Sequence, residues 1–173
     1  MTTIAYKNGI IAYDSMSTRG DLITNRTSDK HLKVSGIHFF LCGAQSDYDD
    51  LICAWFGQDR VKTIPECEAL VVDESGTVWD CACNEENIFW KARIGYAQIY
   101  AIGSGRSCAF SAMDCGKDAR GAVAIAAGRD VCTGGEIRTF SVFSPQVNPE
   151  SQQTCEICGE ALGIFDFKGS VHI

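Results

Sequence analysis

Three residues near the start of the chain have the types needed for an amide-cleaving site. Met1 precedes the small residue Thr2, so removal of the initiator methionine would leave Thr2 with a free α-amine. Its hydroxyl is then a nucleophile, and its amine, with a reference pKa of about 7.7–8.0, is a base within the same residue. Asp14 and Lys30 are charged residues that can assist such a nucleophile. A retained Met1 would block the amine and prevent this chemistry.

A predicted β-hairpin brings Asp14 back toward the start of the chain. The runs Thr3–Tyr6 and Ile10–Tyr13 have β-type composition, and Lys7-Asn8-Gly9 between them contains the Asn-Gly signal of a tight turn. In an antiparallel pair joined there, the beginning of the first strand lies opposite the end of the second, where Asp14 stands. Taken alone, Asp14 also fits an ordinary ion pair with a lysine.

The rest of the chain has short strands interrupted by a few helices. We predict strands at 30–34, 37–42, 69–72, 77–80, 88–91, 97–102 and 137–142, helices at 47–56, 107–114 and 118–131, and a polar loop at 15–25. Alternating βα units are absent, which disfavours a parallel doubly wound sheet. The order indicates an α+β fold with two mainly antiparallel sheets and helices outside them. The length of 173 residues suits a single domain, 1–173.

Composition excludes several functional classes. The net charge is −7 and no basic run is present, which argues against a nucleic-acid or membrane surface. The sequence has neither a long apolar run nor a secretory leader, so we expect a soluble, cytoplasmic protein. Ten cysteines then indicate reduced thiols, several of them inside apolar patterns: Cys42, Cys53, Cys108 and Cys132.

A series of short blocks carries a family resemblance. The blocks are Thr2-Thr3-Ile4-Ala5, Gly9-Ile10-Ile11-Ala12-Tyr13-Asp14-Ser15, Thr18-Arg19-Gly20, Lys30, Gly43-Ala44-Gln45-Ser46-Asp47, Ile102-Gly103-Ser104-Gly105, Ala112-Met113-Asp114-Cys115-Gly116 and Arg129-Asp130-Val131-Cys132-Thr133-Gly134-Gly135. In this order they resemble the proteasome β-subunit superfamily, which includes the bacterial HslV peptidase. The resemblance covers about residues 2–143 and leaves 144–173 as a C-terminal extension.

The resemblance implies a four-layer α-β-β-α sandwich and N-terminal nucleophile chemistry. Thr2 would attack a peptide carbonyl while its own amine takes the proton. Lys30 would lie against the Thr2 hydroxyl and lower its pKa, and Asp14 would pair with Lys30. The amide of Gly43 would stabilise the oxyanion. A further polar set would hydrogen-bond around the amine of the nucleophile: Ser104, Asp130 and Thr133.

The resemblance also implies how substrates and partners bind. Thr18 and Arg19 would lie on the strand edge that pairs with a peptide or unfolded protein, and Leu41 and Gln45 near the pocket for the side chain before the cut. No cofactor is implied. A homo-oligomer, including a ring, is expected. Only one short helix, 47–56, replaces the two long helices on which the HslV ATPase docks, so ring size and an unfoldase partner stay open.

Other interpretations remain beside this one. The chain also fits a non-catalytic member of the family that serves as a structural or interaction subunit. Cys155-Glu156-Ile157-Cys158 is half of a zinc-knuckle spacing, but no second pair is evident, and His172 is a lone further candidate. Gly103-Ser104-Gly105 lacks the third glycine and the βα unit of a nucleotide loop and fits a simple turn as well.

Overall fold

The first of two main antiparallel sheets contains the start of the chain. The computed structural model describes residues 2–58 and 64–142. In spatial order the strands of this sheet are β10 (Tyr100–Gly103), β1 (Thr3–Lys7), β2 (Ile10–Asp14) and β11 (Ile137–Ser141). Asn8 and Gly9 both have positive φ, 50° and 75°, as a type I′ turn requires. The predicted β1–β2 hairpin is confirmed.

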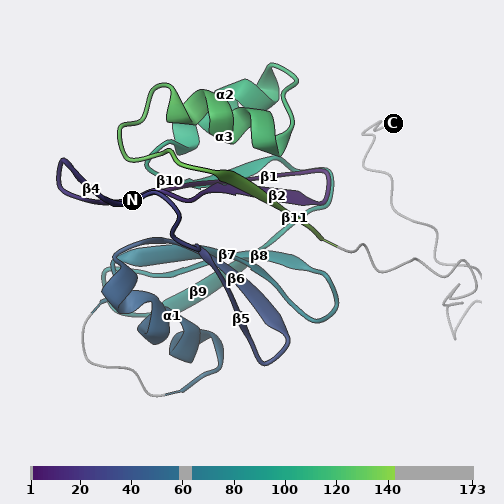
Figure 1. Cartoon of the computed structure of the whole chain (residues 1–173). Coiled ribbons are helices and arrows are strands. Elements are labelled where there is room, and N and C mark those ends of the chain that lie inside the picture. Colours follow the sequence, from purple (N-terminus) through teal and green to yellow (C-terminus); the bar gives the residue numbers. More distant parts are fainter. Residues whose placement is uncertain (1, 59–63, 143–173) are drawn as a thin grey trace, which may run out of the picture.

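The second sheet lies face to face with the first (Figure 1). Its strands, in order, are β5 (His31–Val34), β6 (Ile37–Gly43), β7 (Cys67–Val72), β8 (Val78–Cys83) and β9 (Phe89–Ile94). Each neighbour pair is antiparallel and adjacent in sequence, so the sheet is a meander. A separate hairpin, β3 (Ser17–Arg19) with β4 (Leu22–Asn25), occupies the segment predicted as a polar loop. That prediction was wrong because all of β4 is exposed and shows no alternation of apolar and polar residues.

Helices cover the outer face of each sheet, which gives the four layers α-β-β-α. Helices α2 (Arg106–Asp114) and α3 (Ala119–Ala127) lie on the first sheet, and a short 3₁₀ turn (Gln45–Asp47) leads into α1 (Tyr48–Trp55) on the second (Figure 1). The Asp118 side chain caps α3 by accepting the Gly121 amide at 2.7 Å, as predicted. The helix does not extend to residue 131 as predicted, because Gly128 ends it.

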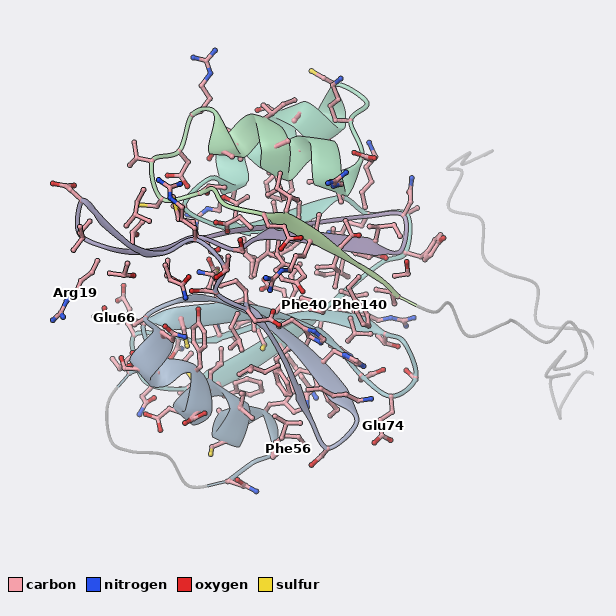
Figure 2. All side chains as sticks on the ribbon, in the orientation of Figure 1. Arg19, Phe40, Phe56, Glu66, Glu74 and Phe140 are labelled. Carbon is pink, nitrogen blue, oxygen red and sulfur yellow. The ribbon has the colours of Figure 1, made fainter. Side chains whose placement is uncertain are left out.

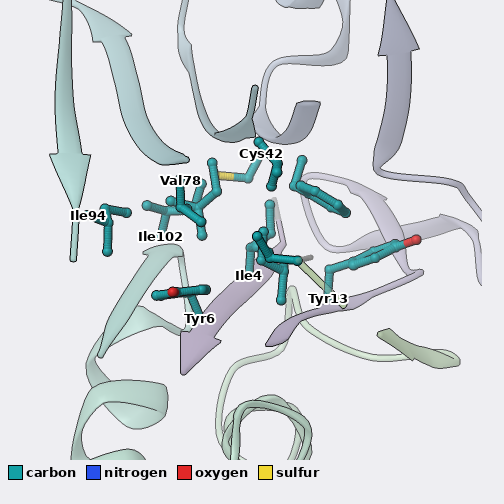
Figure 3. Close-up of a cluster of buried hydrophobic side chains, with 12 residues drawn as sticks. Ile4, Tyr6, Tyr13, Cys42, Val78, Ile94 and Ile102 are labelled. Atoms are coloured by element: carbon teal, nitrogen blue, oxygen red, sulfur yellow. The ribbon is translucent and has the colours of Figure 1, made fainter. Parts of the chain in front are cut away.

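A dry core holds the two sheets together. Figure 3 shows this cluster, in which Ile4, Tyr13 and Ile102 of the first sheet face Cys42 and Val78 of the second. Phe40 and Phe140 meet between the layers with ring centroids 5.2 Å apart (Figure 2). Burial of apolar surface contributes roughly 25 cal/mol per Å². This core therefore fixes the ends of β1 and β6, where the predicted site lies.

The two helical layers pack differently. Alanines and one valine of α2 and α3 lie directly on Ala5 and Ala12, which allows a close approach of helix and sheet. Helix α1 instead packs through aromatic rings, with Trp55 edge-on to Phe39 and Trp79. Within residues 2–58 and 64–142, no helix is long and apolar enough to cross a membrane.

Candidate active site

Thr2 lies at the entrance to β1, held by the neighbouring strand. Its side chain is fully buried, and its carbonyl accepts the Ser104 amide at 3.0 Å. Gly103 makes this approach possible: it has φ +91°, and a Cβ there would lie 1.9 Å from the Thr2 carbonyl oxygen. Only glycine fits this backbone, so the Gly103-Ser104-Gly105 turn seats Thr2.

Asp14 contacts Thr2 directly. Its Oδ1 accepts the Thr2 hydroxyl and the Thr3 amide, the latter at 3.0 Å. Its Oδ2 accepts the amides of Met16 at 3.1 Å and Gly134 at 2.9 Å. Both oxygens of this fully buried carboxylate are thus fixed by donors from three segments.

Lys30 is a buried cation near this carboxylate. It immediately precedes β5, and its side chain is 5% exposed. Burial lowers the pKa of Lys30 below its usual value, while the Asp14 charge opposes that change. Among the ion pairs of the described chain, none joins Lys30 to Asp14 within 4.0 Å. The charges of Lys30 and Asp14 therefore interact electrostatically without an ion-pair contact. Asp14 accepts a hydrogen bond from Thr2 and does not form the predicted contact pair with Lys30.

The predicted polar set Ser104, Asp130 and Thr133 forms a hydrogen-bonded chain. The Ser104 and Thr133 hydroxyls both donate to Asp130 Oδ2 at 2.5 Å. Burial raises the pKa of Asp130, but these two bonds and the Cys132 amide at 3.1 Å lower it further than burial raises it. The network therefore favours the carboxylate form of Asp130.

Thr3 joins this network and was not predicted as a site residue. Its Oγ1 lies 2.5 Å from Thr133 Oγ1 and accepts the Gly105 amide at 3.1 Å. It thereby links β1 to both loops that surround Thr2. The available sequence signal was the pair Thr2-Thr3 directly before the apolar run 4–6.

The candidate oxyanion residue Gly43 ends β6 with φ +109°. A Cβ at this position would lie 2.3 Å from the Glu66 carbonyl, which in turn accepts the Ala44 amide at 2.8 Å. Gly43 is therefore required for the chain to turn from β6 toward α1.

A cavity of about 450 Å³ opens beside Thr2. Its lining comes from both sheets and α2: Thr2, Cys42, Gly43, Glu66, Cys67, Glu68, Ala82, Gly103, Ser104, Arg106 and Ser107. Three predicted site residues thus line the same cavity: Thr2, Gly43 and Ser104.

The four predicted substrate-binding residues do not line this cavity. Thr18 and Arg19 lie on the β3–β4 hairpin, at the same end of the molecule as Glu66 (Figure 2). Gln45 is exposed on the 3₁₀ turn. Leu41 is fully buried in the core beneath α1, where its carbonyl accepts the Tyr48 hydroxyl at 3.2 Å, so the structure differs from the expectation at this residue.

Glu68 is a cavity residue that sequence reasoning missed. Its Oε1 accepts the Gly103 amide at 2.9 Å and the Cys42 thiol at 3.4 Å, and so joins β7 to β10 and β6. The available signal was a charged residue inside the apolar run Cys67–Val72, since a carboxylate within a buried strand requires partners. Such a position is typical of a functional or structural polar contact.

No group of three or more His, Cys, Asp or Glu side chains in residues 2–58 and 64–142 has the geometry to hold a metal ion. Cys155 and Cys158 lie outside the described residues, so the zinc hypothesis for them stays a prediction.

Comparisons with known proteins match the fold. No known protein family and no curated protein matches this sequence. Thiobacillus denitrificans BPH in complex with epoxomicin aligns with a TM-score of 0.60 and 18% identity, over 82% of this chain and 98% of that chain. A second structure of T. denitrificans BPH gives 0.59 and 16%, over 82% and 98%. Eukaryotic HslV from Trypanosoma brucei gives 0.60 and 17%, over 80% and 97%. The chain therefore has the proteasome-type N-terminal nucleophile hydrolase fold.

Proposed function

We propose that this chain is a threonine-type endopeptidase related to HslV, with Thr2 as its nucleophile after removal of Met1. One observation carries the proposal: the buried Thr2 hydroxyl donates to the fixed Asp14 carboxylate, and Thr2 lines the cavity that Gly43 and Ser104 also line. The fold shared with T. brucei HslV supports the same assignment. The substrate is a peptide or an unfolded protein segment.

The proposed reaction passes through an ester on Thr2. The Thr2 hydroxyl attacks the peptide carbonyl carbon while the α-amine takes its proton, directly or through water. The Gly43 amide donates to the resulting oxyanion, a contribution of about 3–4 kcal/mol in comparable sites. The tetrahedral intermediate collapses, and the leaving amine takes the proton from the α-ammonium. Water then hydrolyses the ester with the α-amine again acting as base.

Lys30 and Asp14 prepare the hydroxyl for attack. A cation near the developing alkoxide stabilises it, and the Asp14 charge favours the charged form of Lys30 against the effect of burial. Asp14 orients the hydroxyl through its hydrogen bond. The Ser104–Asp130–Thr133 chain supplies polar groups on the other side of Thr2.

Assembly into a homo-oligomer, which includes a ring, is part of the proposal. T. denitrificans BPH has been solved in complex with epoxomicin, and we expect that compound to react with this chain as well. Native mass spectrometry of the purified protein measures subunit number. A monomer with full peptidase activity would remove the assembly from the proposal.

A peptidase assay tests the nucleophile. Wild-type protein, Thr2→Ala and Thr2→Ser are incubated with an unstructured peptide mixture, and products are identified by mass spectrometry. Thr2→Ala should lose more than about 10³-fold in rate, because the nucleophile is gone, whereas Thr2→Ser retains measurable turnover. Thr27→Ala, at an exposed threonine, is the matched control. Undiminished cleavage by Thr2→Ala, or none by the processed wild type, would overturn the proposal; the latter would favour the non-catalytic subunit.

A further inference from the structure

The cavity beside Thr2 has an acidic wall on β7. Glu66 immediately precedes this strand and Glu68 lies within it, and both line the cavity. Glu68 projects between the sheets, where one oxygen accepts the Gly103 amide. Its carboxylate therefore lies next to the glycine that seats Thr2.

A third carboxylate stands behind Glu68. Asp80 on β8 is 5% exposed, and the β7–β8 register pairs it with Leu70, two residues from Glu68 and on the same face. Its Oδ2 accepts the Tyr100 hydroxyl at 2.5 Å, but its buried Oδ1 has no hydrogen-bond partner in the described part of the chain. Burial raises the pKa of Asp80, while the Tyr100 hydrogen bond opposes that change, so Asp80 places a further carboxyl group behind the wall.

Positive charge at the cavity is weak by comparison. Arg106, at the start of α2, is its sole cationic side chain among the described lining residues. Its guanidinium is 60% exposed and lies 3.9 Å from Glu68, the outer limit of an ion pair. Exposed pairs of this kind contribute little and are easily exchanged. A ligand cation can therefore replace Arg106 at Glu68.

Part of the remaining lining is apolar, beside the hydroxyl residues Ser104 and Ser107. Cys42, Cys67 and Ala82 line the cavity around the carboxylates. Burial raises the pKa of the Cys67 thiol to about 12 and that of Cys42 well above its usual value, so both stay uncharged. Uncharged buried thiols behave as small hydrophobic groups. The cavity thus has an apolar part, formed by Cys42, Cys67 and Ala82, next to the Glu66 and Glu68 carboxylates.

We propose that this cavity binds a lysine or arginine side chain of the substrate next to the scissile bond, so that cleavage occurs beside basic residues. Such side chains have an aliphatic stem and a cationic head, which match the thiol and alanine walls and the Glu66 and Glu68 carboxylates. This inference rests on the proposed peptidase function, because it assigns the substrate class of the same site.

Peptide binding tests the pocket without cleavage. The full-length Thr2→Ala variant is titrated with the pentapeptides acetyl-Ala-Ala-X-Ala-Ala-amide, with X lysine, arginine, norleucine or glutamate. Lysine and arginine should bind roughly tenfold more tightly than norleucine, with glutamate weakest, as expected for a charge-assisted contact. The advantage should shrink at high salt. Equal binding of lysine and norleucine, or no binding of any peptide, would overturn the inference.

Charge-removing variants assign the contact. Glu68→Gln keeps an acceptor for the Gly103 amide but removes the charge, and with Glu66→Gln it should abolish the lysine preference. Glu74→Gln is the matched control, since Glu74 lies in the β7–β8 turn at the opposite end of the molecule from Glu66 (Figure 2). A preference that survives Glu66→Gln with Glu68→Gln would overturn the assignment to this wall.

Cleavage by the wild type separates this inference from the proposed function. Cuts beside lysine and arginine support both. Cuts with no preference for basic residues keep the peptidase and overturn the pocket. Preferential binding of lysine peptides by a wild type that cuts nothing keeps the pocket and overturns the peptidase.

Discussion

The two sides of the Thr2 site differ in how completely their charged groups are buried and hydrogen-bonded. On the nucleophile side, Asp14 is fully buried and both its oxygens are held by donors. On the cavity side, Arg106 and Glu68 form one long, exposed ion pair, and Asp80 keeps an oxygen without a partner in the described chain. Chemistry needs groups fixed before the substrate arrives, whereas recognition can leave charge for the ligand to satisfy. Under the proposed function, the rigid side around Asp14 would set the rate, and the loose side at Glu68 and Arg106 would set the substrate preference.

The largest expected effect comes from removing the buried charge of the rigid side. Lys30→Met should lower peptide turnover roughly 10²–10⁴-fold, because the nearby cation is lost. The same change should raise the melting temperature at neutral pH, since burial disfavours the charged lysine.

The sign follows from the lowered pKa of Lys30. Between the lowered pKa of the folded state and the unfolded value of about 10.4, the folded state binds fewer protons than the unfolded state. The charged lysine therefore lowers the free energy of unfolding below the folded pKa. This destabilisation disappears as the pH rises through that window. Thermal scans from pH 7 to 10.5 should show the two proteins converging. A Lys30→Met protein less stable at every pH would contradict this account.

Gly103, which packs against the Thr2 carbonyl, is the next position at which the rigid side can be tested. Gly103→Ala should destabilise the protein by about 1–3 kcal/mol more than Gly116→Ala, because overpacking against the Thr2 carbonyl is added to a similar backbone strain. The two glycines have φ +91° and +89°, but a Cβ at Gly116 meets nothing within 4 Å. Urea unfolding measures both. Equal destabilisation would mean that the backbone at Thr2 yields easily.

The Asp130 network should have an intermediate effect. Asp130→Asn replaces an oxygen that accepts two hydroxyls by a group of lower acceptor strength, and we expect kcat to fall roughly ten- to hundredfold. KM should change little, since Asp130 does not line the cavity. Steady-state kinetics separates the two, and a change confined to KM would move Asp130 from the rigid side to recognition.

The smallest effect is expected on the loose side. Arg106→Ala removes the cation that competes for Glu68, so the preference for lysine over norleucine should rise about two- to fivefold while kcat stays constant. Competition between the two peptides in one reaction measures the ratio. A lower preference would show that Arg106 helps to hold the pocket open.

Local patterns predicted much of the fold. The Asn8-Gly9 turn and the Asp118 cap were correct because each depends on neighbouring residues alone. The β3–β4 hairpin was missed, since its exposed strands lack alternation, and α3 is shorter than predicted because Gly128 ends it. The hydrogen bond from Ser104 to Asp130 after this helix was also not visible in the sequence. No single-residue pattern marks such a long-range bond.

The candidate site divides in the same way. Asp14 opposite the start of the chain followed from the hairpin geometry, and the structure gives that contact as a hydrogen bond to Thr2. Local patterns marked Glu68 and Thr3 as unusual but did not give their roles, because their partners Gly103 and Thr133 come from distant segments. Leu41 was predicted to lie near the pocket, but in the structure it lies in the core, because its position on the strand faces α1.

An intact-mass measurement tests most directly whether Thr2 is the nucleophile. The intact mass of the purified protein is determined before and after incubation with epoxomicin, whose epoxyketone requires both the hydroxyl and the free amine of an N-terminal threonine. We expect a starting mass without Met1, one adduct per chain, and no adduct on Thr2→Ala. A processed protein that stays unmodified, or an adduct that persists on Thr2→Ala, would contradict Thr2 as the nucleophile.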